Sequence, residues 1–583
     1  MTREASTREA TTREASLADL RRNPRTRVLV IGGGVNGAAV FRDLALQGID
    51  CILVDAGDWC AGTSAAPSRL IHGGLKYLET GEFRLVAEST RERNLLLRNA
   101  PHYVHPLSSV VPIHSYFGGI LPSLKRFFGG KAELIDRGLL IVELGMLLYD
   151  LFGVRDRSMP FHRFALRRRV RRTFPGMTAA IIATATYYDA RVSHAERLVF
   201  ELVDDGLRAH PGARAVNYLP ATGFASGRVQ LTDQRTREVI EVQPEIIVNA
   251  AGPWIDRVNR ALTRPTSYIG GAKGSHLVVD NAELRAALGE HMIYYGGSDG
   301  RVCLAYPFFD HVLLGSTDIP ITDPDAATCD PEEIAYMLTT LREVFPDIAV
   351  SPDQVIFHYA GVRPLPQAEA ATPGEVTRDH SLEQDRIGDL SIYSMIGGKW
   401  TTFRAFAAET TDTILTALSH MRRCSTEREP IGGGRGFPRS SISRADWIGH
   451  FSANHGLSRA RSEVLLERYG TAAHRVARTS GYRLAEALAS LPDYSYGEIQ
   501  ALIRTEQVVT LADLVFRRTT IAIAGQLTMA AIEELAEIIG STLNWTDAWR
   551  SSQIEETVKF ARDRHGIRLL YHPRQGKPFT LRQ

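Results

Sequence analysis

The stretch Val28-Leu-Val-Ile-Gly-Gly-Gly-Val-Asn-Gly37 leads from four apolar residues into the spacing Gly32-x-Gly34-x-x-Gly37. We interpret it as a buried strand that turns sharply into a helix N-terminus, an arrangement that binds a pyrophosphate. A second apolar run ends at Asp55, eighteen residues after Gly37, where a carboxylate can accept hydrogen bonds from a ribose. The spacing predicts a dinucleotide site and leaves the choice between NAD and FAD open. A plain βαβ turn is the alternative.

The bulk composition sets limits on the function. The chain has 583 residues, 44% of them hydrophobic and 23% charged, and a formal net charge of +2 at pH 7. This is ordinary for a soluble globular protein and gives no indication of nucleic-acid binding, while the length favours about three or four structural units. The five cysteines are scattered without a Cys-x-x-Cys pair, so we expect no metal site, no disulfide framework and a reducing compartment. No apolar run is long enough for a spanning helix.

Two segments stand out by composition. Residues 1–25 begin with near-repeats of Thr-Arg-Glu-Ala that have almost nothing to bury, so we expect a solvated, disordered tail. Residues 115–175 mix large apolar side chains with dense arginine, above all at 167–172. That mixture is typical of attachment to an anionic membrane surface. Core helices with a solvated basic face are the alternative.

The order of the other elements favours an α/β fold. We expect helices over 82–99 and 194–207, then short strands, and then a strand that ends in Ala-Ala-Gly252. This order of elements is typical of a flavoprotein rather than of a simple NAD dehydrogenase. Residues 268–358 are β-rich, with a helix over 331–345. A second glycine turn, Gly397-Gly398-Lys399, opens onto a helix N-terminus that can stabilise negative charge. Beyond 438 the pattern is helical, and Thr528 should cap a helix that ends at Gly540.

An ordered series of motifs resembles one family: the FAD-dependent, quinone-linked (aerobic-type) glycerol-3-phosphate dehydrogenases, within the D-amino-acid-oxidase-like flavoprotein superfamily. The motifs are Gly32-Gly-Gly-Val-Asn-Gly37, Leu70-Ile-His-Gly-Gly-Leu-Lys-Tyr-Leu78, Asn249-Ala-Ala-Gly-Pro-Trp254, Lys273-Gly-Ser-His276, Gly315-Ser-Thr-Asp318, Ala360-Gly-Val-Arg-Pro-Leu365, Thr377-Arg-Asp379 and Gly397-Gly-Lys-Trp-Thr-Thr-Phe-Arg404. The resemblance implies FAD as the cofactor. The residues it assigns to FAD are Gly32, Gly34, Asn36, Gly37, Asp55, Thr63, Ser64, Gly73, Gly74, Gly252, Gly397, Gly398 and Lys399.

The resemblance also implies a reaction, the oxidation of sn-glycerol 3-phosphate to dihydroxyacetone phosphate by hydride transfer to flavin N5, with electrons passed to membrane quinone. We take His276 as the general base, because an imidazole suits that role, and His72 as its rival. Lys399 is assigned to stabilising charge in the reduced flavin. The cations and the tyrosine expected to hold the substrate are Arg363, which also acts in catalysis, Arg378, Lys76 and Tyr77.

The architecture that follows is a Rossmann-like FAD-binding domain interleaved with a β-rich substrate domain and followed by an all-α C-terminal cap. The expected boundaries are 1–25 for the tail, 26–100, 181–265 and 356–420 for the FAD-binding parts, 101–180 for a helical, membrane-contacting insertion, 266–355 for the substrate domain, 421–438 for a linker and 439–583 for the cap.

Three departures from the family pattern keep alternatives open. Lys76 stands where the family usually has Arg, so a related polyol phosphate such as a tetritol phosphate is an alternative substrate. Asp55 replaces the common Glu, and the N-terminal repeats have no counterpart in the family. An oxygen-using glycerophosphate oxidase and a flavin-binding protein without turnover are further alternatives. We expect a cytoplasmic protein attached to the inner face of the cell membrane and no nucleic-acid partner, and we allow for a homodimer.

Overall fold

The fold is described from a computed structural model, over residues 12–75, 82–116, 138–153, 159–296, 301–367 and 379–569. The chain divides into two compact units. The first comprises Met1–Phe437 with Glu467–Thr471, and the second comprises Pro438–Leu466 with Ala472–Gln583. Each unit is described below by itself.

The first sheet of unit 1 carries the glycine loop. Its described strands run in the order β17-β18-β10-β1-β2-β7, and β8 and β9 extend from β10. Pairing is parallel from β18 through β10, β1 and β2 to β7, and antiparallel for β17 and for the β8–β9 hairpin. The strands are β1 (Arg25–Ile31), β2 (Cys51–Val54), β7 (Arg214–Val216), β8 (Ala221–Ala225), β9 (Arg228–Thr232), β10 (Val239–Asn249), β17 (Ser381–Ile387) and β18 (Leu390–Ile396).

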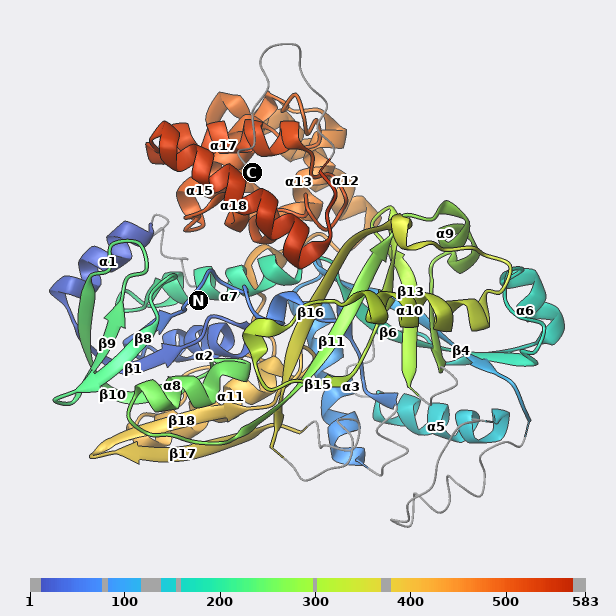
Figure 1. The fold of residues 1–583 in the computed structure, drawn as a ribbon, viewed down its shortest axis with the longest axis horizontal. Helices are drawn as coiled ribbons and strands as arrows, with labels where there is room; N and C mark the ends of the chain where they lie inside the picture. The colour runs from blue at the N-terminus through green and yellow to red at the C-terminus, as the bar shows by residue number, and fades with distance from the viewer. Residues whose placement is uncertain are drawn as a thin grey trace. The chain divides into compact units, whose positions relative to one another are not determined.

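Both faces of this sheet are covered, which explains why its central strands are continuously apolar. Val28 and Val30 of β1 face a core shared with helices α2 (Val35–Leu46), α7 (Ala195–Ala209) and α11 (Phe403–Ala417). Leu29 and Ile31 alternate to the other face and pack with residues of β9 and the N-terminal segment. Figure 1 shows the three helices gathered along the sheet. The carboxyl ends of β1, β2, β10 and β18 consequently meet along one edge.

The second sheet forms the other half of unit 1. Its described strands run β15-β11-β14-β13-β12-β4-β6-β3, with β16 paired to β11 and β5 to β6. β11 and β16 pair antiparallel along almost their whole length and lie side by side in Figure 1. The strands are β3 (Leu70–Ile71), β4 (Val104–Ile113), β5 (Arg163–Leu166), β6 (Ala183–Val192), β11 (Ile269–Val279), β12 (His291–Gly296), β13 (Val302–Phe308), β14 (His311–Gly315), β15 (Ile319–Pro320) and β16 (Val355–Pro366).

This sheet draws on more of the chain than residues 266–355. Strands β3, β6 and β16 come from segments expected in the FAD-binding parts, and β4 and β5 come from the expected helical insertion. The reason is pairing: ten residues of β4 pair with ten of β6, and β12 then pairs with β4. The remaining helices of unit 1 are α3 (Phe83–Asn99), α5 (Leu139–Phe152), α6 (Arg167–Thr173), α8 (Ile255–Ala261), α9 (Ala282–Leu288) and α10 (Pro331–Val344).

The N-terminal segment contains a helix, α1 (Arg13–Arg22), where a disordered tail was expected. Thr12 caps it, and Leu17 and Leu20 are buried against the first sheet. The Arg13 guanidinium donates to Asp233 at 2.9 Å, and both side chains are almost fully buried. The expectation of a disordered 1–25 is therefore wrong for this helix. Arg13 of the last repeat and two leucines that follow it have partners in the fold.

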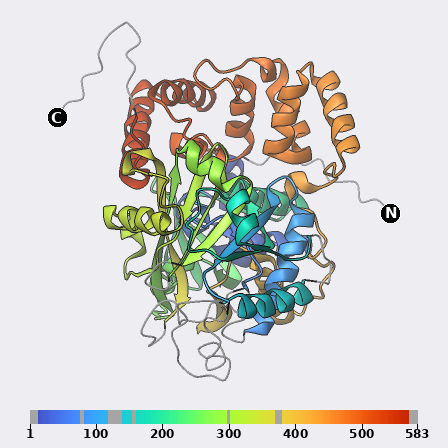
Figure 2. The same cartoon turned by 90° about the vertical axis from the view of Figure 1, so that its right-hand side faces the viewer.

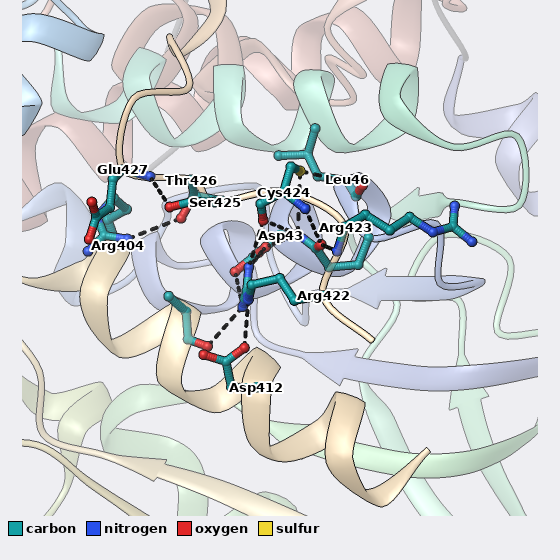
Figure 3. Close-up of polar contacts among 12 residues, drawn as sticks. Asp43, Leu46, Arg404, Asp412, Arg422, Arg423, Cys424, Ser425, Thr426 and Glu427 are labelled. Atoms are coloured by element: carbon teal, nitrogen blue, oxygen red, sulfur yellow. Dashed lines mark hydrogen bonds and ion pairs between the residues drawn. The ribbon is translucent and has the colours of Figure 1, made fainter. Parts of the chain in front are cut away.

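The glycine- and proline-rich segment that begins at 421 is anchored to unit 1 at its start. Figure 3 shows Arg422 between Asp43 of α2 and Asp412 of α11, with donor–acceptor distances of 2.9 and 2.6 Å. The side chain of Arg404 reaches Thr426 at 3.1 Å from the same side. The amino-terminal part of the predicted linker is therefore held to α2 and α11 by the ion pairs of Arg422.

The described residues of unit 2 are helical, as expected, and Figure 2 shows them in orange to red. The helices are α12 (Ser441–His455), α13 (Arg459–Tyr469, whose last residues belong to unit 1), α14 (Ala473–Ser480), α15 (Tyr496–Thr505), α16 (Leu511–Asp513), a π-helical turn at Leu514–Arg518, α17 (Met529–Leu543) and α18 (Asp547–His565). Thr528 caps α17, but the helix passes through the buried Gly540 and ends at Asn544, which is left-handed. Packing of the Gly540 face outweighs the weak helix propensity of glycine.

The docking of α1 gives a stability prediction. Arg13→Ala leaves the buried Asp233 carboxylate without its ion pair, and should lower the free energy of unfolding by about 1–3 kcal/mol. Arg22→Ala is the matched control, since Arg22 lies on the same helix, is 73% exposed and pairs with Asp19 only at 3.7 Å; it should change stability by less than about 0.5 kcal/mol. Denaturant unfolding measures both. Equal effects of the two substitutions would contradict the docked helix.

Candidate active site

The glycine loop lies where β1 turns into α2. Gly32 has φ +112°, and a Cβ there would lie 2.5 Å from the carbonyl oxygen of Ala250, at the end of β10. A Cβ on Gly37 would lie 1.9 Å from the carbonyl oxygen of Gly32. Neither position accepts a side chain, so helix and strand approach as closely as two backbones can. The first turn of α2 thus points at the edge where four parallel strands end, which is where open α/β sheets bind ligands.

Asp55 follows β2 and faces the same loop. Its Oδ2 accepts a hydrogen bond from the Gly33 N–H at 2.5 Å, and its Oδ1 accepts one from the Gly57 N–H at 2.7 Å. Two backbone donors therefore fix the carboxylate beside the glycine loop. This is the location expected for a group that accepts hydrogen bonds from a dinucleotide ribose.

Thr63 and Ser64 join the glycine loop to the second sheet. The Ser64 hydroxyl accepts from the N–H of Val35, the first residue of α2, at 3.0 Å. The Thr63 hydroxyl donates to the carbonyl oxygen of Val362 in β16 at 2.7 Å. A Trp400 N–H donates to the Ser64 carbonyl at 3.1 Å. These two residues consequently connect the start of α2 with β16 of the second sheet.

The second glycine turn meets the first. Gly397 and Gly398 follow β18 with φ +75° and +92°, and the Asn36 amide of α2 donates to the Gly397 carbonyl at 3.5 Å. A Cβ on Gly398 would lie 2.8 Å from the Asn36 amide nitrogen, and half-buried Lys399 continues the turn. The Asn36 Oδ1 is buried without a hydrogen-bond partner among the described residues. A buried acceptor between two glycine turns fits a site that a bound cofactor completes.

The segment 72–74 and Gly252 complete the expected cofactor set. The His72 N–H donates to the Thr401 hydroxyl at 3.1 Å, just beyond the second glycine turn. The Gly73 N–H donates to Tyr149 and Asp189, and Gly74 has φ +77°. Gly252 has φ +56°, and no atom lies within 4 Å of the position a Cβ would take. The structure thus brings segment 72–74 to the second glycine turn.

His276 is held on the second sheet by packing. It lies opposite Tyr359 in the β11–β16 pair, and the two rings stack with centroids 5.1 Å apart and planes 16° apart. A Cβ on Gly315 of β14 would lie 2.2 Å from the His276 ring, so glycine makes room for it. Neither ring nitrogen has a hydrogen-bond partner among the described residues. Burial, together with the positive charges of Arg363 and Arg69, lowers the pKa of His276 to about 3, so the imidazole is neutral.

Arg363 lies on the same face of the sheet. It is four residues beyond Tyr359 on β16, and side chains two or four apart share one face of a strand. Its guanidinium donates to Asp318 at 2.8 Å and lies over Gly274, where a Cβ would be 2.4 Å from Nη2. The side chain is 26% exposed. The structure therefore brings His276 and Arg363 together on one face, with Arg363 close enough to lower the pKa of His276.

The segment that follows Ser64 ties this face to the first sheet. Tyr359 donates its hydroxyl hydrogen to the carbonyl oxygen of Pro67 at 2.8 Å, and Tyr306 donates to Ser68 at 3.0 Å. Arg69 is buried and pairs with Glu196 at 2.5 Å. Residues 63–69 thus bond both to the glycine loop and to the tyrosine that stacks on His276.

Three predicted substrate-binding residues, Lys76, Tyr77 and Arg378, lie outside the described residues, so their roles stay predictions.

Two residues that help to position this face, Tyr359 and Arg69, were not predicted from the sequence. Strand alternation could have placed Tyr359 on the face of Arg363, because the two are four residues apart in an apolar run. Nothing in the sequence around Arg69 indicates that it becomes a buried ion-pair residue.

Two further observations concern the described residues alone. No group of His, Cys, Asp and Glu side chains among them is arranged to hold a metal ion. None of their helices is both long enough and apolar enough to cross a membrane.

The glycine loop gives a prediction about the bound dinucleotide. Gly37→Ala puts a Cβ against the Gly32 carbonyl, which must displace α2 from the phosphate site, so purified protein should carry less than about a tenth of the wild-type cofactor. Gly145→Ala is the matched control, because Gly145 lies within α5 and a Cβ there meets no atom within 4 Å. Absorbance of the released cofactor per protein measures both. Full occupancy in Gly37→Ala would refute the placement of the site.

Family models match both units. A model described as FAD dependent oxidoreductase matches residues 27–381, and a model described as the C-terminal domain of alpha-glycerophosphate oxidase matches residues 424–550. The first match spans more than half of the chain. It includes the glycine loop, Asp55, His276 and Arg363.

Individual relatives agree with these matches. The chain is 30% identical to a glycerol-3-phosphate dehydrogenase of Synechocystis sp., over 92% of this chain and 96% of the relative, and 29% identical to a D-erythritol 1-phosphate dehydrogenase of Brucella abortus, over 84% and 93%. Its fold is similar to that of a glycerol-3-phosphate dehydrogenase from Bacillus halodurans complexed with FAD, with a TM-score of 0.75 at 23% identity, over 97% of this chain and 100% of that one. The resemblance drawn from the motifs, the fold class and the cofactor are thereby confirmed. The chain belongs to the FAD-dependent oxidoreductases of the glycerol-3-phosphate dehydrogenase and oxidase family, and its cofactor is FAD.

Proposed function

We propose that this enzyme oxidises sn-glycerol 3-phosphate to dihydroxyacetone phosphate and passes the electrons to a membrane quinone. The observation that carries the proposal is the common face of His276 and Arg363, which residues 63–69 tie to the glycine loop. We therefore assign a base and a cation to the side of the cofactor-binding edge. The glycerol-3-phosphate dehydrogenase of Synechocystis sp., similar along nearly the whole chain, supports this substrate.

His276 acts as the general base that takes the proton of the substrate hydroxyl. Its pKa of about 3 keeps the imidazole neutral, so a lone pair is available at every physiological pH. Part of that lowering comes from the positive charge of Arg363. A phosphate dianion bound nearby offsets this charge and raises the pKa of His276, which makes the imidazole a stronger base in the complex. His72 remains the alternative base.

Different cations bind different groups of the substrate in this proposal. Arg363 already donates to Asp318, so it has fewer donors left for a phosphate and is better suited to the reacting oxygen. We therefore assign the phosphate to Arg378 and Lys76, with Tyr77 completing the pocket. When bound, FAD accepts a hydride at N5. Lys399, in the turn beside Asn36, supplies a positive charge for the reduced ring.

Two observations favour specific alternatives. Lys76 in place of the usual arginine, and the similarity to a D-erythritol 1-phosphate dehydrogenase, favour a tetritol phosphate as a second candidate substrate. The match of residues 424–550 to a domain of alpha-glycerophosphate oxidase keeps oxygen as a second candidate acceptor. A flavin-binding protein without turnover is the least favoured alternative, because binding FAD alone does not require His276 and Arg363 on one face.

We propose attachment to the inner face of the cell membrane through α5 and α6. Leucines at 140, 144, 147 and 151 of α5 are 53–65% exposed and recur at helical spacing, so they form one outward apolar stripe. The five arginines of α6, at 167, 168, 169, 171 and 172, are exposed as well. An apolar stripe together with exposed arginines fits the interface of an anionic bilayer. This arrangement favours the membrane over the alternative of a basic face that is merely solvated.

Anaerobic bleaching of the bound flavin tests the substrate. We expect sn-glycerol 3-phosphate to remove the flavin absorbance near 450 nm within seconds, and D-erythritol 1-phosphate to do so more slowly. Glycerol lacks the phosphate and should react at least about tenfold more slowly than sn-glycerol 3-phosphate, since one lost contact to a charged group costs about 1.5–3 kcal/mol. Reoxidation by a soluble quinone and by oxygen is followed in the same cuvette. Flavin that the glycerol phosphate fails to bleach would exclude the proposed substrate.

His276→Ala tests the base. Because general-base catalysis contributes typically 10²–10⁴-fold, flavin reduction should slow by about that factor while substrate affinity and FAD content stay the same. His358→Ala is the matched control: His358 lies on β16 opposite Leu277, on the other face of the sheet. Stopped-flow reduction measures both variants. A normal rate in His276→Ala would move the role of base to His72.

Neutralising α6 tests the membrane contact. The triple change of Arg168, Arg169 and Arg172 to Gln should release most of the protein from vesicles that contain anionic lipid, at about 1 kcal/mol per arginine. The same change at the exposed Arg228, Arg235 and Arg237, which lie near the β8–β9 hairpin, is the control and should have no effect. Sedimentation with vesicles measures the bound fraction. Unchanged sedimentation of the α6 variant would contradict the proposed surface.

A further inference from the structure

Three buried polar side chains form a hydrogen-bonded cluster with the backbone N–H of Gly73. The Gly73 N–H donates to the Tyr149 hydroxyl and to Asp189 Oδ1, each at 3.0 Å. The Tyr149 hydroxyl donates in turn to Asp189 Oδ1 at 2.5 Å. Arg93 donates to the Tyr149 oxygen at 2.7 Å and to Asp189 at 3.1 Å. One main-chain amide is therefore held by a charged cluster, at a position expected to face FAD.

The members of this cluster come from four different elements. Tyr149 lies on α5, Asp189 on β6, Arg93 on α3, and Gly73 just after β3. All three side chains are at most 5% exposed. A Cβ on Gly73 would lie 2.3 Å from the Tyr149 hydroxyl oxygen and 2.5 Å from a methyl carbon of Thr90. Only glycine lets the cluster close so tightly on the chain.

Tyr149 stays protonated, as this geometry requires. Burial raises the pKa of its hydroxyl well above the ordinary value, although the charge of Arg93 opposes the shift. The hydroxyl can therefore donate to Asp189 while its oxygen accepts from Gly73 and Arg93. Such a buried network, fully satisfied, fixes the position of each member.

Segment 72–74 is consequently held at two points. His72 is bonded to Thr401, beside the second glycine turn, and Gly73 is bonded to the cluster. The cluster also connects this segment with α5, whose opposite face carries the exposed leucine stripe. Tyr149, Met146 and Val142 form the inward face of that helix. One hydroxyl thus connects the helix that we assign to the membrane with a segment that we assign to FAD.

We propose that Tyr149 is a positioning residue, which acts through the Gly73 N–H to hold segment 72–74 against the bound FAD. The inference rests on the proposed location of this segment beside the flavin. Tyr149 touches no reacting atom. Its hydroxyl orders a backbone segment before FAD arrives, so that less ordering remains for binding.

Tyr149→Phe removes the hydroxyl and keeps the ring. Tyr187→Phe is the matched control, because Tyr187 is equally buried, contacts the Tyr149 ring edge-on at 5.6 Å, and bonds to Ser109 instead of Gly73. Apoprotein of each variant is titrated with FAD, and amide exchange is followed for the peptide that contains Gly73. In Tyr149→Phe we expect the Kd for FAD to rise about fivefold or more, the size of one lost hydrogen bond, and the Gly73 amide to exchange faster. Tyr187→Phe should stay within about twofold of wild type.

An unchanged FAD affinity in Tyr149→Phe, or an equal loss in both variants, would overturn the proposal. Asp189→Asn serves as a second variant if Tyr149→Phe fails to fold, since it keeps an oxygen acceptor for the Gly73 N–H but removes the charge that faces Arg93. It should weaken FAD binding by a similar factor, and wild-type affinity in it would count equally against the proposal. FAD binding requires no substrate, so a wrong assignment of the polyol phosphate leaves this test intact.

Discussion

The active site depends on the contact between the start of α2 and the end of β1. A Cβ on Gly37 would lie 1.9 Å from the Gly32 carbonyl oxygen, so the helix approaches the strand at backbone distance. This approach aims the first turn of α2 at the edge where β1, β2, β10 and β18 end. Asp55 then accepts from Gly33 of the loop, and Asn36 of α2 donates to Gly397 in the turn after β18. The cofactor site is a consequence of that single close contact.

Residues 63–69 connect the glycine loop with the second sheet, on which His276 lies. Ser64 accepts from the first residue of α2, Thr63 donates to β16, and Pro67 accepts from the tyrosine that stacks on His276. Because these bonds follow one another along a few residues, the distance between the glycine loop and His276, the proposed base, is fixed locally. The chemistry that we propose needs this, since a base misplaced by about 1 Å can cost two orders of magnitude in rate.

His276 differs from a histidine that a carboxylate orients. Stacking on Tyr359 and the absence of a side chain at Gly315 position its ring, while both ring nitrogens lack a partner among the described residues. Burial keeps it neutral, and the charge of Arg363 contributes. A negative charge bound near Arg363 would therefore raise the pKa of His276. In the mechanism that we propose, this effect couples substrate binding to proton transfer.

Much of this was accessible from the sequence, for physical reasons. The glycine spacing and the apolar runs predicted the βαβ unit, because close backbone approach requires glycine and a strand buried on both faces requires apolar residues. His276 and Arg363 came from motifs. Gly274 and Gly315 belong to the same motifs, but nothing in the sequence showed that they make room for these two side chains. Strand β4 was hidden in a segment read as helical, because its pairing with β6, about 80 residues further along the chain, leaves no local pattern. The helix α1 was missed because two leucines directly after the polar repeats are too few to predict a buried face.

The most direct measurement is a crystal structure of the oxidised enzyme with FAD and dihydroxyacetone phosphate, a complex that cannot turn over. We expect the pyrophosphate of FAD at the first turn of α2, and the carbonyl oxygen of the product about 2.6–3.2 Å from the His276 ring. The phosphate of the product should contact Arg378 or Lys76. A product bound away from the face shared by His276 and Arg363, with FAD in place, would contradict the account.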